Sequence, residues 1–162
     1  MVLKTGTKEH LDLMIELERR NFGNDRAEIR EAYGLILELG GEVLLEYRDG
    51  IATGMLAIVD VSELLENRER VLSLPENSPF RERFKRGYLD KYTGYKFINA
   101  FVSEEASKDL LREFLNVKRA VGFVYDEKEK LETYEKLGCR KDGTVQNIHS
   151  PEKVDYILVR EI

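Results

Sequence analysis

The side chains best suited to metal binding and nucleophilic catalysis are scarce in this sequence. Cys139 is the only cysteine, and His10 and His149 are the only histidines. A single cysteine cannot form an internal disulfide, and three such residues so far apart do not make the clustered ligand set that a zinc ion requires. The sequence therefore predicts no metal site. Cys139 is expected to be a small core residue, and both histidines are expected at the surface.

The composition limits the class of protein. The 162 residues fit a single domain, and 42% hydrophobic with 35% charged residues is typical of a globular chain with a charged surface. The net charge of -5 argues against nucleic-acid binding, which needs a basic surface. No apolar run is long enough to span a membrane, and the N-terminus lacks a signal-peptide pattern. A cytoplasmic location is therefore expected.

Two amphipathic helices and a hairpin are predicted in the first third of the chain. Residues 8–23 place apolar side chains on one helical face: Leu11, Met14, Ile15 and Phe22. The next helix is predicted over residues 25–39, with Asp25 and Glu28 at the spacing of a capping box. Asp49-Gly50 then predicts a tight turn between two strands, the second of which, residues 51–61, is apolar enough to lie inside a sheet.

The segment 62–95 allows two interpretations. It contains a predicted loop and then aromatic residues at every fourth position: Phe80, Phe84, Tyr88 and Tyr92. This spacing predicts a helix that packs its rings against the sheet. The same stretch is basic, so an anion-attracting surface is the alternative.

Strands and helices alternate in the rest of the chain. We expect a strand at 95–102, a helix from Ser103, a strand at 120–126, a helix to residue 137 and two final strands. Asp126 and Glu129 again have capping-box spacing. The whole order predicts an α/β fold in one domain, residues 1–162, with helices layered on a mixed sheet.

The stretch "AVGFVYDEKEKLETYEKLGCRKDG", with this order of elements, resembles the GNAT superfamily of N-acetyltransferases. The family has a buried strand followed by a helix that ends in the pattern Y-x-K-L-G-F. Tyr134, Lys136, Leu137 and Gly138 match that pattern, and Cys139 replaces the aromatic residue. The resemblance implies a mixed sheet of about six to seven strands flanked by about four helices.

The resemblance also implies an activity, the transfer of an acetyl group from acetyl-CoA to an amine. In the family the fourth and fifth strands splay apart, and the pantetheine arm binds backbone groups of the fourth strand. That strand is residues 97–102 in this chain, so Ala100, Phe101 and Val102 are the implied contacts, and the partner strand is 121–125. By the same resemblance Tyr134 would protonate the leaving thiolate, since a phenol stays protonated at neutral pH. The alternative is that Tyr134 only fills the buried stripe of its helix.

The family's pyrophosphate loop is altered in this chain. In the family this loop carries the pattern Q/R-x-x-G-x-G/A. In this chain the loop is about five residues shorter and has no glycine, and Glu104 and Glu105 stand where the phosphate would approach. Acidic side chains stabilise the first turn of a helix but repel an anion. Ser107 and Lys108 could still supply a hydroxyl and a positive charge.

No general base stands out in the sequence. Asp60, at the end of the central strand, and Glu63 are the nearest carboxylates by chain order, although a strand-end carboxylate is usually only solvated. Three functions stay open: an acetyl-CoA-dependent N-acetyltransferase, a degenerate GNAT-fold binding or regulatory protein, and an acyltransferase with an acyl carrier protein donor. The expected partners are a small-molecule or protein amine, no nucleic acid and no membrane, and a homodimer is a further expectation.

Overall fold

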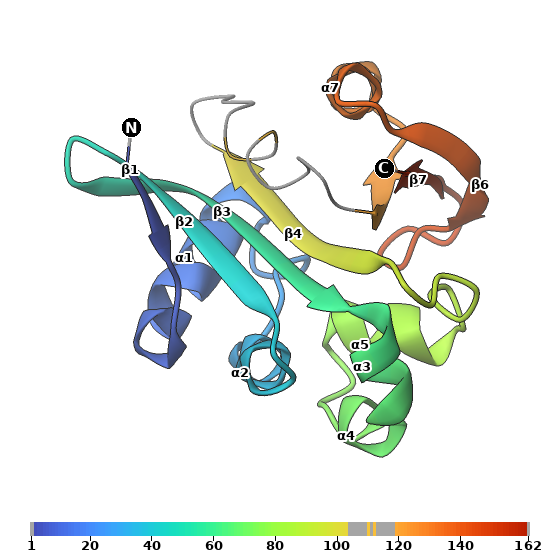
Figure 1. The fold of residues 1–162 in the computed structure, drawn as a ribbon, viewed down its shortest axis with the longest axis horizontal. Helices are drawn as coiled ribbons and strands as arrows, with labels where there is room; N and C mark the ends of the chain where they lie inside the picture. Colours follow the sequence, from blue (N-terminus) through green and yellow to red (C-terminus); the bar gives the residue numbers. More distant parts are fainter. Residues whose placement is uncertain (1, 104–109, 111, 113–118, 162) are drawn as a thin grey trace.

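A computed structural model gives the fold and describes residues 2–103, 110, 112 and 119–161. One seven-stranded sheet runs through the molecule in the order β1-β2-β3-β4-β5-β7-β6 (Figure 1). Its strands are β1 (Val2–Thr5), β2 (Glu42–Arg48), β3 (Ile51–Asp60), β4 (Lys96–Ser103), β5 (Ala120–Tyr125), β6 (Arg140–Gln146) and β7 (Val154–Arg160). All neighbouring pairs are antiparallel except β4 and β5, which are parallel. The sheet is therefore mixed, as predicted.

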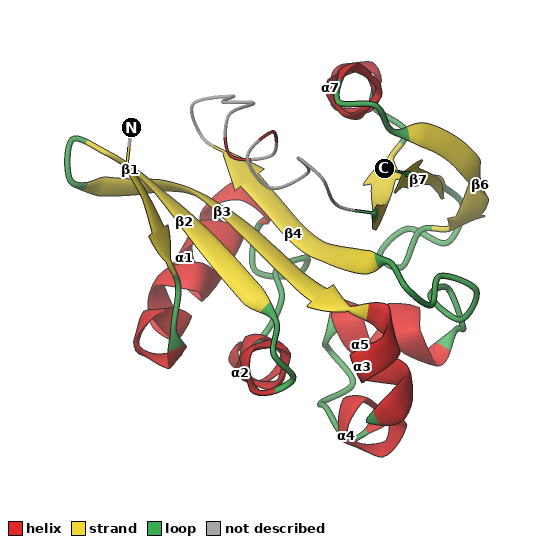
Figure 2. Cartoon of the chain, viewed as in Figure 1, coloured by secondary structure: helices red, strands yellow, loops and turns green. Residues whose placement is uncertain are grey.

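Helices cover both faces of the sheet (Figure 2). One face, which we call the helix-rich face, carries η1 (Lys8–His10), α1 (Leu11–Phe22), α2 (Arg30–Glu38), α3 (Val61–Glu66), α4 (Arg68–Leu72) and α5 (Pro79–Lys85). The other face, the α7 face, carries α7 (Lys128–Lys136). No helix in the described part of the chain is long and apolar enough to cross a bilayer.

Each face has its own hydrophobic core, because alternate strand residues point to opposite sides of the sheet. The larger cluster lies under the helix-rich face and includes Tyr33, Phe80 and Phe97. The smaller one lies under α7 and includes Leu131 and Tyr134. A residue's membership in one cluster or the other therefore shows on which face of β4 and β5 its side chain lies.

Several local predictions are confirmed. The hairpin turns at Asp49 and Gly50, whose φ angles of 52° and 77° are those that such a tight turn requires. Helix α1 ends at Phe22, and its C-cap, Gly23, has a φ of 81°. The turn and the helix stop depend on glycine's access to positive φ, so short-range patterns were sufficient to predict them.

Both predicted capping boxes are wrong. Helix α2 begins at Arg30 after Ile29, which provides no side-chain cap, and the carboxylate of Glu28 turns inward to accept a hydrogen bond from the backbone N of Phe80 at 2.8 Å. Helix α7 begins after Glu127, whose side chain also makes no capping bond. Tertiary contacts, absent from the local pattern, decide where the carboxylate of Glu28 points.

The predicted helix over residues 80–92 is also wrong beyond Lys85, where α5 ends. Gly87 follows at a φ of 79°, and the Tyr88 and Tyr92 hydroxyls reach β6, bonding to the Gln146 carbonyl at 2.9 Å and to Asp142 at 2.7 Å. The hydrogen bonds of the Tyr88 and Tyr92 hydroxyls to β6 therefore replace the predicted packing of these rings on a continued helix.

The predicted number of helices is also too low. The short helices α3 and α4 were not predicted, so the described residues form six α-helices where about four were expected. Apart from Leu110 and Arg112, the segment of the helix expected after Ser103 lies outside the described residues.

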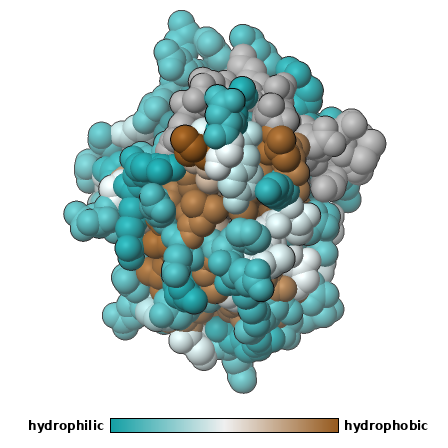
Figure 3. Space-filling model, turned by 90° about the vertical axis from the view of Figure 1, so that its left-hand side faces the viewer, coloured by the Kyte–Doolittle hydropathy of each residue, from teal (hydrophilic) through white to brown (hydrophobic). Residues whose placement is uncertain are grey.

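Strand β1 forms one edge of the sheet and is only four residues long. Seen from this side, hydrophobic residues reach the surface in patches among hydrophilic ones (Figure 3). Val2 and Ile51 are among the most exposed apolar side chains, at 55% and 64%. A short edge strand limits pairing with a second chain, and the expected homodimer stays a prediction.

Candidate active site

The most irregular part of the sheet is the junction of β4 and β5. These parallel strands pair only at Lys96 with Ala120 and Phe97 with Val121, and then diverge. On its other edge β4 stays paired with β3 as far as Ser103. The backbone groups of residues 98–102 that face β5 therefore have no ladder partner in the described part of the chain. The predicted splay of strands 97–102 and 121–125 is confirmed.

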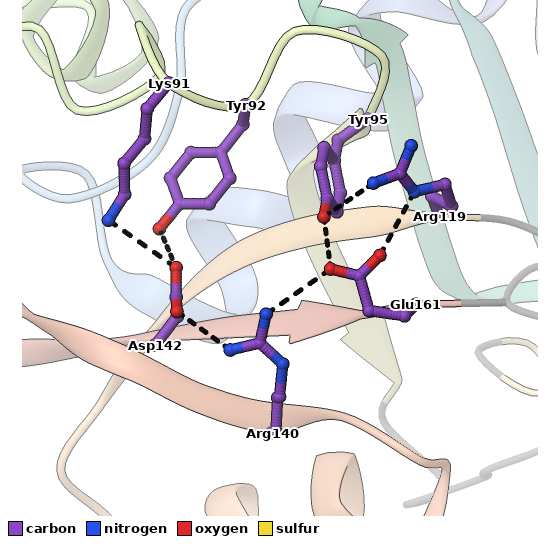
Figure 4. A network of polar contacts seen from close by, with 7 residues as sticks. All are labelled: Lys91, Tyr92, Tyr95, Arg119, Arg140, Asp142 and Glu161. Carbon is purple, nitrogen blue, oxygen red and sulfur yellow. Dashed lines mark hydrogen bonds and ion pairs between the residues drawn. The ribbon is translucent and has the colours of Figure 1, made fainter.

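A polar network surrounds the closed end of this wedge (Figure 4). We call it the closed-end network, and its members are Lys91, Tyr92, Tyr95, Arg119, Arg140, Asp142 and Glu161. Tyr95 and Arg119 directly precede β4 and β5, and the Arg119 guanidinium donates to the Tyr95 hydroxyl at 2.9 Å. Glu161 accepts hydrogen bonds from Tyr95, from Arg119 at 3.1 Å and from Arg140 at 3.3 Å. The network ties the starts of β4 and β5 to β6 and to the C-terminal end of β7.

The open end of the wedge is a cleft of about 470 Å³ that reaches both faces of the sheet. On the α7 face it is lined by Ile98, Phe101, Gly122, Val124 and Tyr134. On the helix-rich face it is lined by residues from α1, the α1–α2 loop, α5 and the β6–β7 turn. Two molecules that entered from opposite faces would therefore meet between β4 and β5.

Tyr134 dominates the α7 side of the cleft. Its side chain is 8% exposed, and its ring packs edge-on against that of Phe101, with centroids 6.4 Å apart. Burial raises the pKa of Tyr134, with a smaller contribution from Cys139 nearby. The phenol is therefore protonated at neutral pH and can only donate a proton. Cys139 is buried, and its burial raises its thiol pKa to about 11, which agrees with the predicted core role.

The structure brings together most of the residues predicted for the site. Ala100, Phe101 and Val102 of β4 line the cleft with Tyr134. Asp60 is not brought there, because it pairs with Lys96 at the closed end of the wedge, where the Lys96 ammonium lies 2.8 Å from its carboxylate. The predicted Ser107 and Lys108 lie outside the described residues.

Asn99 occupies a bulge in β4. The register with β3 passes from Ile98 to Ala100, so Asn99 has no opposite residue. Asn99 lines the cleft, and both its amide oxygen and its amide nitrogen are buried without a hydrogen-bond partner in the described part of the chain. An unsatisfied buried amide is costly, which marks Asn99 as a group available to a ligand.

Two buried carboxylates line the helix-rich side. Glu18 and Glu28 are each 4% exposed. Glu18 accepts hydrogen bonds from the Tyr33 hydroxyl and from the backbone N of Glu28, the latter at 3.1 Å. Burial raises the pKa of Glu18 to about 7, against the lowering effect of these two bonds, and burial also raises the pKa of Glu28. Glu18 can therefore exchange a proton near neutral pH.

Arg83 of α5 lines the same side. Its Nε is buried without a hydrogen-bond partner, and no described carboxylate lies within ion-pairing distance of its guanidinium. Its charge still acts at a distance, lowering the pKa of Glu18 and of Glu28. Arg83 is thus a cation directed at the cleft without an ion-pair partner in the described chain.

His149 reaches the cleft from the β6–β7 turn. Asn147 holds this turn, because its side-chain oxygen accepts from the backbone N of His149 at 2.9 Å and of Ser150 at 2.8 Å. The Asn147 side-chain nitrogen donates to buried Asp155 at 2.8 Å. Burial, Arg83 and Arg26 lower the pKa of His149, so its ring is neutral at neutral pH. His149, expected at the surface, is half-buried and lines the cleft.

The sequence contained a signal for Glu18 that the prediction passed over. Leu11, Met14 and Ile15 form the buried apolar stripe of α1, and Glu18 continues it where another apolar residue is expected. Phe22, also predicted for this stripe, is 38% exposed. A lone carboxylate on a buried face is rarely tolerated without a partner or a role. Arg83 and His149 had no comparable signal, because their segments carry no regular pattern at those positions.

No protein-family model matches the chain, and no curated protein matches it in sequence. Solved structures do match over the whole chain. A GNAT-family acetyltransferase from Bacillus cereus is 12% identical, with a TM-score of 0.63, and the match covers 99% of this chain and 96% of that one. The Arabidopsis thaliana protein Naa50, solved with the bisubstrate analogue CoA-Ac-MVNAL, is 15% identical with a TM-score of 0.65, covering 99% and 98%.

A third similar structure is the GNAT-like decarboxylase GphF in complex with isobutyryl-CoA. It is 12% identical, with a TM-score of 0.66, and the match covers 99% of this chain and 98% of that one. Identities this low indicate a shared fold and no more, and one fold can carry different reactions.

Proposed function

Because the chain has the GNAT fold and its cleft opens between β4 and β5, we propose that it is an acyl-CoA-dependent N-acyltransferase. The observation that carries the proposal is the early end of β4–β5 pairing at Phe97 and Val121. It leaves a row of backbone donors and acceptors along an otherwise buried strand, and buried backbone groups need partners. An extended chain with amide groups, such as a pantetheine arm, would satisfy them as an added strand does.

The described residues fit the reactive end of an acyl-CoA. Residues 98–102 of β4 would hold the arm through their backbone, and the unsatisfied amide of Asn99 lies beside them. A bound acyl-CoA supplies an acyl group activated as a thioester. Tyr134 is placed on the α7 side of the cleft and stays protonated, so it would donate a proton to the departing sulfur.

Glu18 is the general base in this proposal. A base works best when its pKa lies near the working pH, and Glu18 meets that condition with a pKa of about 7. It lies on the helix-rich side, across the sheet from Tyr134, so the two groups would serve the amine and the thiol separately. Asp60 receives no role, because it lies at the closed end of the wedge.

The donor is proposed to be acetyl-CoA, and the acceptor an amine. A degenerate binding protein is the alternative, and an acyl carrier protein donor is a third reading. An acidic carrier would need the basic stretch of residues 80–92 as its anion-attracting surface. That stretch is mostly engaged elsewhere: Arg86 pairs with Glu82, Lys91 with Asp142, and Arg83 faces the cleft. The free acyl-CoA reading therefore has the better support.

The first test is a thermal shift with acetyl-CoA and with CoA. A ligand at about one hundred times its Kd stabilises the folded state by about 2.7 kcal/mol, which moves the melting temperature by several degrees. We expect such a shift for acetyl-CoA, followed by release of CoA thiol when an amine is added. No shift at millimolar acetyl-CoA would contradict the proposal, and a shift without thiol release for any amine would favour the binding protein.

The second test is Tyr134→Phe. We expect turnover to fall by about 10²-fold or more with nearly unchanged acetyl-CoA affinity, because only the proton donor is lost. Tyr47→Phe is the matched control, since it removes a hydroxyl from β2, outside the cleft. Equal turnover in the two variants would remove Tyr134 from the mechanism.

A further inference from the structure

The helix-rich side of the cleft, where the acceptor would bind, contains an anion-binding group that the proposed transfer reaction does not use. Arg83 extends from α5 with a buried Nε that has no partner in the described part of the chain. The nearby carboxylates do not pair with it. Those of Glu18 and Glu28 accept hydrogen bonds from Tyr33, Phe80 and backbone groups of the α1–α2 loop instead.

Arg83 is half-buried, and its Nε is shielded from solvent without a hydrogen-bond partner in the described part of the chain. An anion would give this guanidinium the ionic partner that it lacks, and the planar group matches a carboxylate through two parallel hydrogen bonds. Arg26 lines the same side from the α1–α2 loop, and both arginines lower the pKa of His149. Two guanidinium groups therefore line this part of the cleft beside a neutral imidazole, together with the carboxylates of Glu18, Glu28 and Asp155.

The remaining polar groups suit an amine. Asn99 has an unsatisfied side-chain oxygen that can accept from an N–H, and Glu18 can take up a proton near pH 7. Asn99 lies on the bulge of β4, next to the backbone proposed to hold the thioester end. Asn99 and Glu18, which can accept from an amine, thus line the same pocket as Arg83, which can bind an anion.

The volume of the cleft suits a small acceptor. The whole cleft has a volume of about 470 Å³, and the thioester end of the donor would fill part of it. Pockets of this size are typical of small-molecule sites. The β6–β7 turn and α5 border it through His149 and Arg83.

We propose that the acceptor is an amino acid, meaning a small primary amine that carries a carboxylate. The carboxylate binds the Arg83 guanidinium, and the amine is directed toward Asn99 and Glu18. This inference rests on the proposed function and specifies its substrate class. Transfer forms a C–N bond at the acceptor nitrogen and breaks the C–S bond of the thioester; Glu18 takes the proton lost by the nitrogen, and Tyr134 gives one to the sulfur.

The test compares matched pairs of amino acids and their decarboxylated amines: glycine with methylamine, and leucine with 3-methylbutylamine. Binding is measured by calorimetry without acyl-CoA, and turnover by thiol release from acetyl-CoA. We expect each amino acid to bind at least tenfold more tightly than its amine and to give the higher kcat/KM. Equal or better binding and turnover with the amines would overturn the inference.

Arg83→Gln locates the carboxylate. We expect this change to weaken amino-acid binding tenfold or more, to leave amine binding alone, and to preserve the thermal shift with acetyl-CoA. Lys85→Gln is the matched control, because it removes the same charge from an exposed position on the same helix. If Arg83→Gln does not fold, Arg83→Lys keeps the charge without the two-pronged geometry and should show the same selective loss.

Two outcomes are separable. If acetyl-CoA does not shift the melting temperature of the unmodified protein, the acyltransferase proposal is contradicted. Intact acetyl-CoA binding and thiol release with an acceptor preference that ignores the carboxylate, or that Arg83→Gln leaves unchanged, contradicts only the amino-acid inference.

Discussion

The two ends of the β4–β5 junction differ in almost every physical respect. At the closed end the strands pair, Phe97 stacks on Phe80 with centroids 6.1 Å apart, and the closed-end network satisfies its own charges. At the open end the pairing stops, and Asn99 and Arg83 have buried polar atoms without partners in the described chain. The two regions are separated by a few residues on the same pair of strands.

This contrast shows how the fold can keep a site with unsatisfied polar groups. Unpaired buried groups destabilise a structure and persist only when the surroundings hold them in place. Here a packed and paired end adjoins the open one, so the divergence of the strands does not propagate. Changes at the closed end should therefore affect stability first, and changes at the open end should affect binding first.

The largest expected effect is on stability, from Phe97→Ala at the closed end. Removing this ring, which is 1% exposed, should lower the free energy of unfolding by about 3–5 kcal/mol. Denaturant unfolding measures the loss. Phe84→Ala is the control, a buried ring on α5 outside both strands. We expect only Phe97→Ala to weaken acetyl-CoA binding as well, measured at a temperature where both variants are folded. Equal binding in both variants would show that the packing of the closed end does not influence the open end.

Filling the open end should weaken acetyl-CoA binding without loss of stability. Gly122 lines the cleft with Ile98, and a Cβ added at Gly122 would lie 3.8 Å from the Ile98 side chain. We expect Gly122→Leu to reduce acetyl-CoA affinity about 100-fold, which is about 2.7 kcal/mol, with unchanged or higher stability. Gly34→Leu on α2, where an added Cβ meets open space, should leave affinity alone. Retained affinity in Gly122→Leu would place the donor elsewhere.

The pH profile tests the base at the open end. Glu18 must lose its proton to act, so kcat/KM should rise as the pH increases through about 7. Glu18→Gln should lower the rate and abolish this inflection, because no carboxylate remains to titrate. His149 has a pKa below its ordinary value, so its own titration falls at lower pH. An inflection near 7 that survives Glu18→Gln and disappears in His149→Gln would assign the base to His149.

The smallest effect is expected from Glu161→Gln in the closed-end network. Its hydrogen bonds with Tyr95 and Arg119 lower the pKa of Glu161, so it contributes stability above the ordinary pKa of a glutamate and loses it as the pH falls further. Because the network is exposed to solvent, we expect only a small drop in melting temperature at pH 7, smaller still in high salt, and unchanged acetyl-CoA binding. A drop as large as that of Phe97→Ala would show that the network, and not the packed ring, holds the closed end.

Much of the fold could be predicted from short-range patterns. The stripe of α1, the Asp49-Gly50 turn and the run before Asp60 each follow from interactions between near neighbours in the chain. The Y-x-K-L-G pattern placed Tyr134 on a helix after a buried strand, and the structure has it there. The predictions failed where distant segments decide the outcome, as for the end of α5 and the direction of Glu28.

The order of the strands and the buried faces of α1, α2 and α7 follow from the sequence alone, because periodicity and turn chemistry act over a few residues. Only the tertiary structure decided which polar residues share the cleft. Glu18, Arg83, Asn99 and His149 come from four separate segments and meet where β4 leaves β5. Their burial, and with it the raised pKa of Glu18 and the lowered pKa of His149, arises only when these segments exclude water from one another.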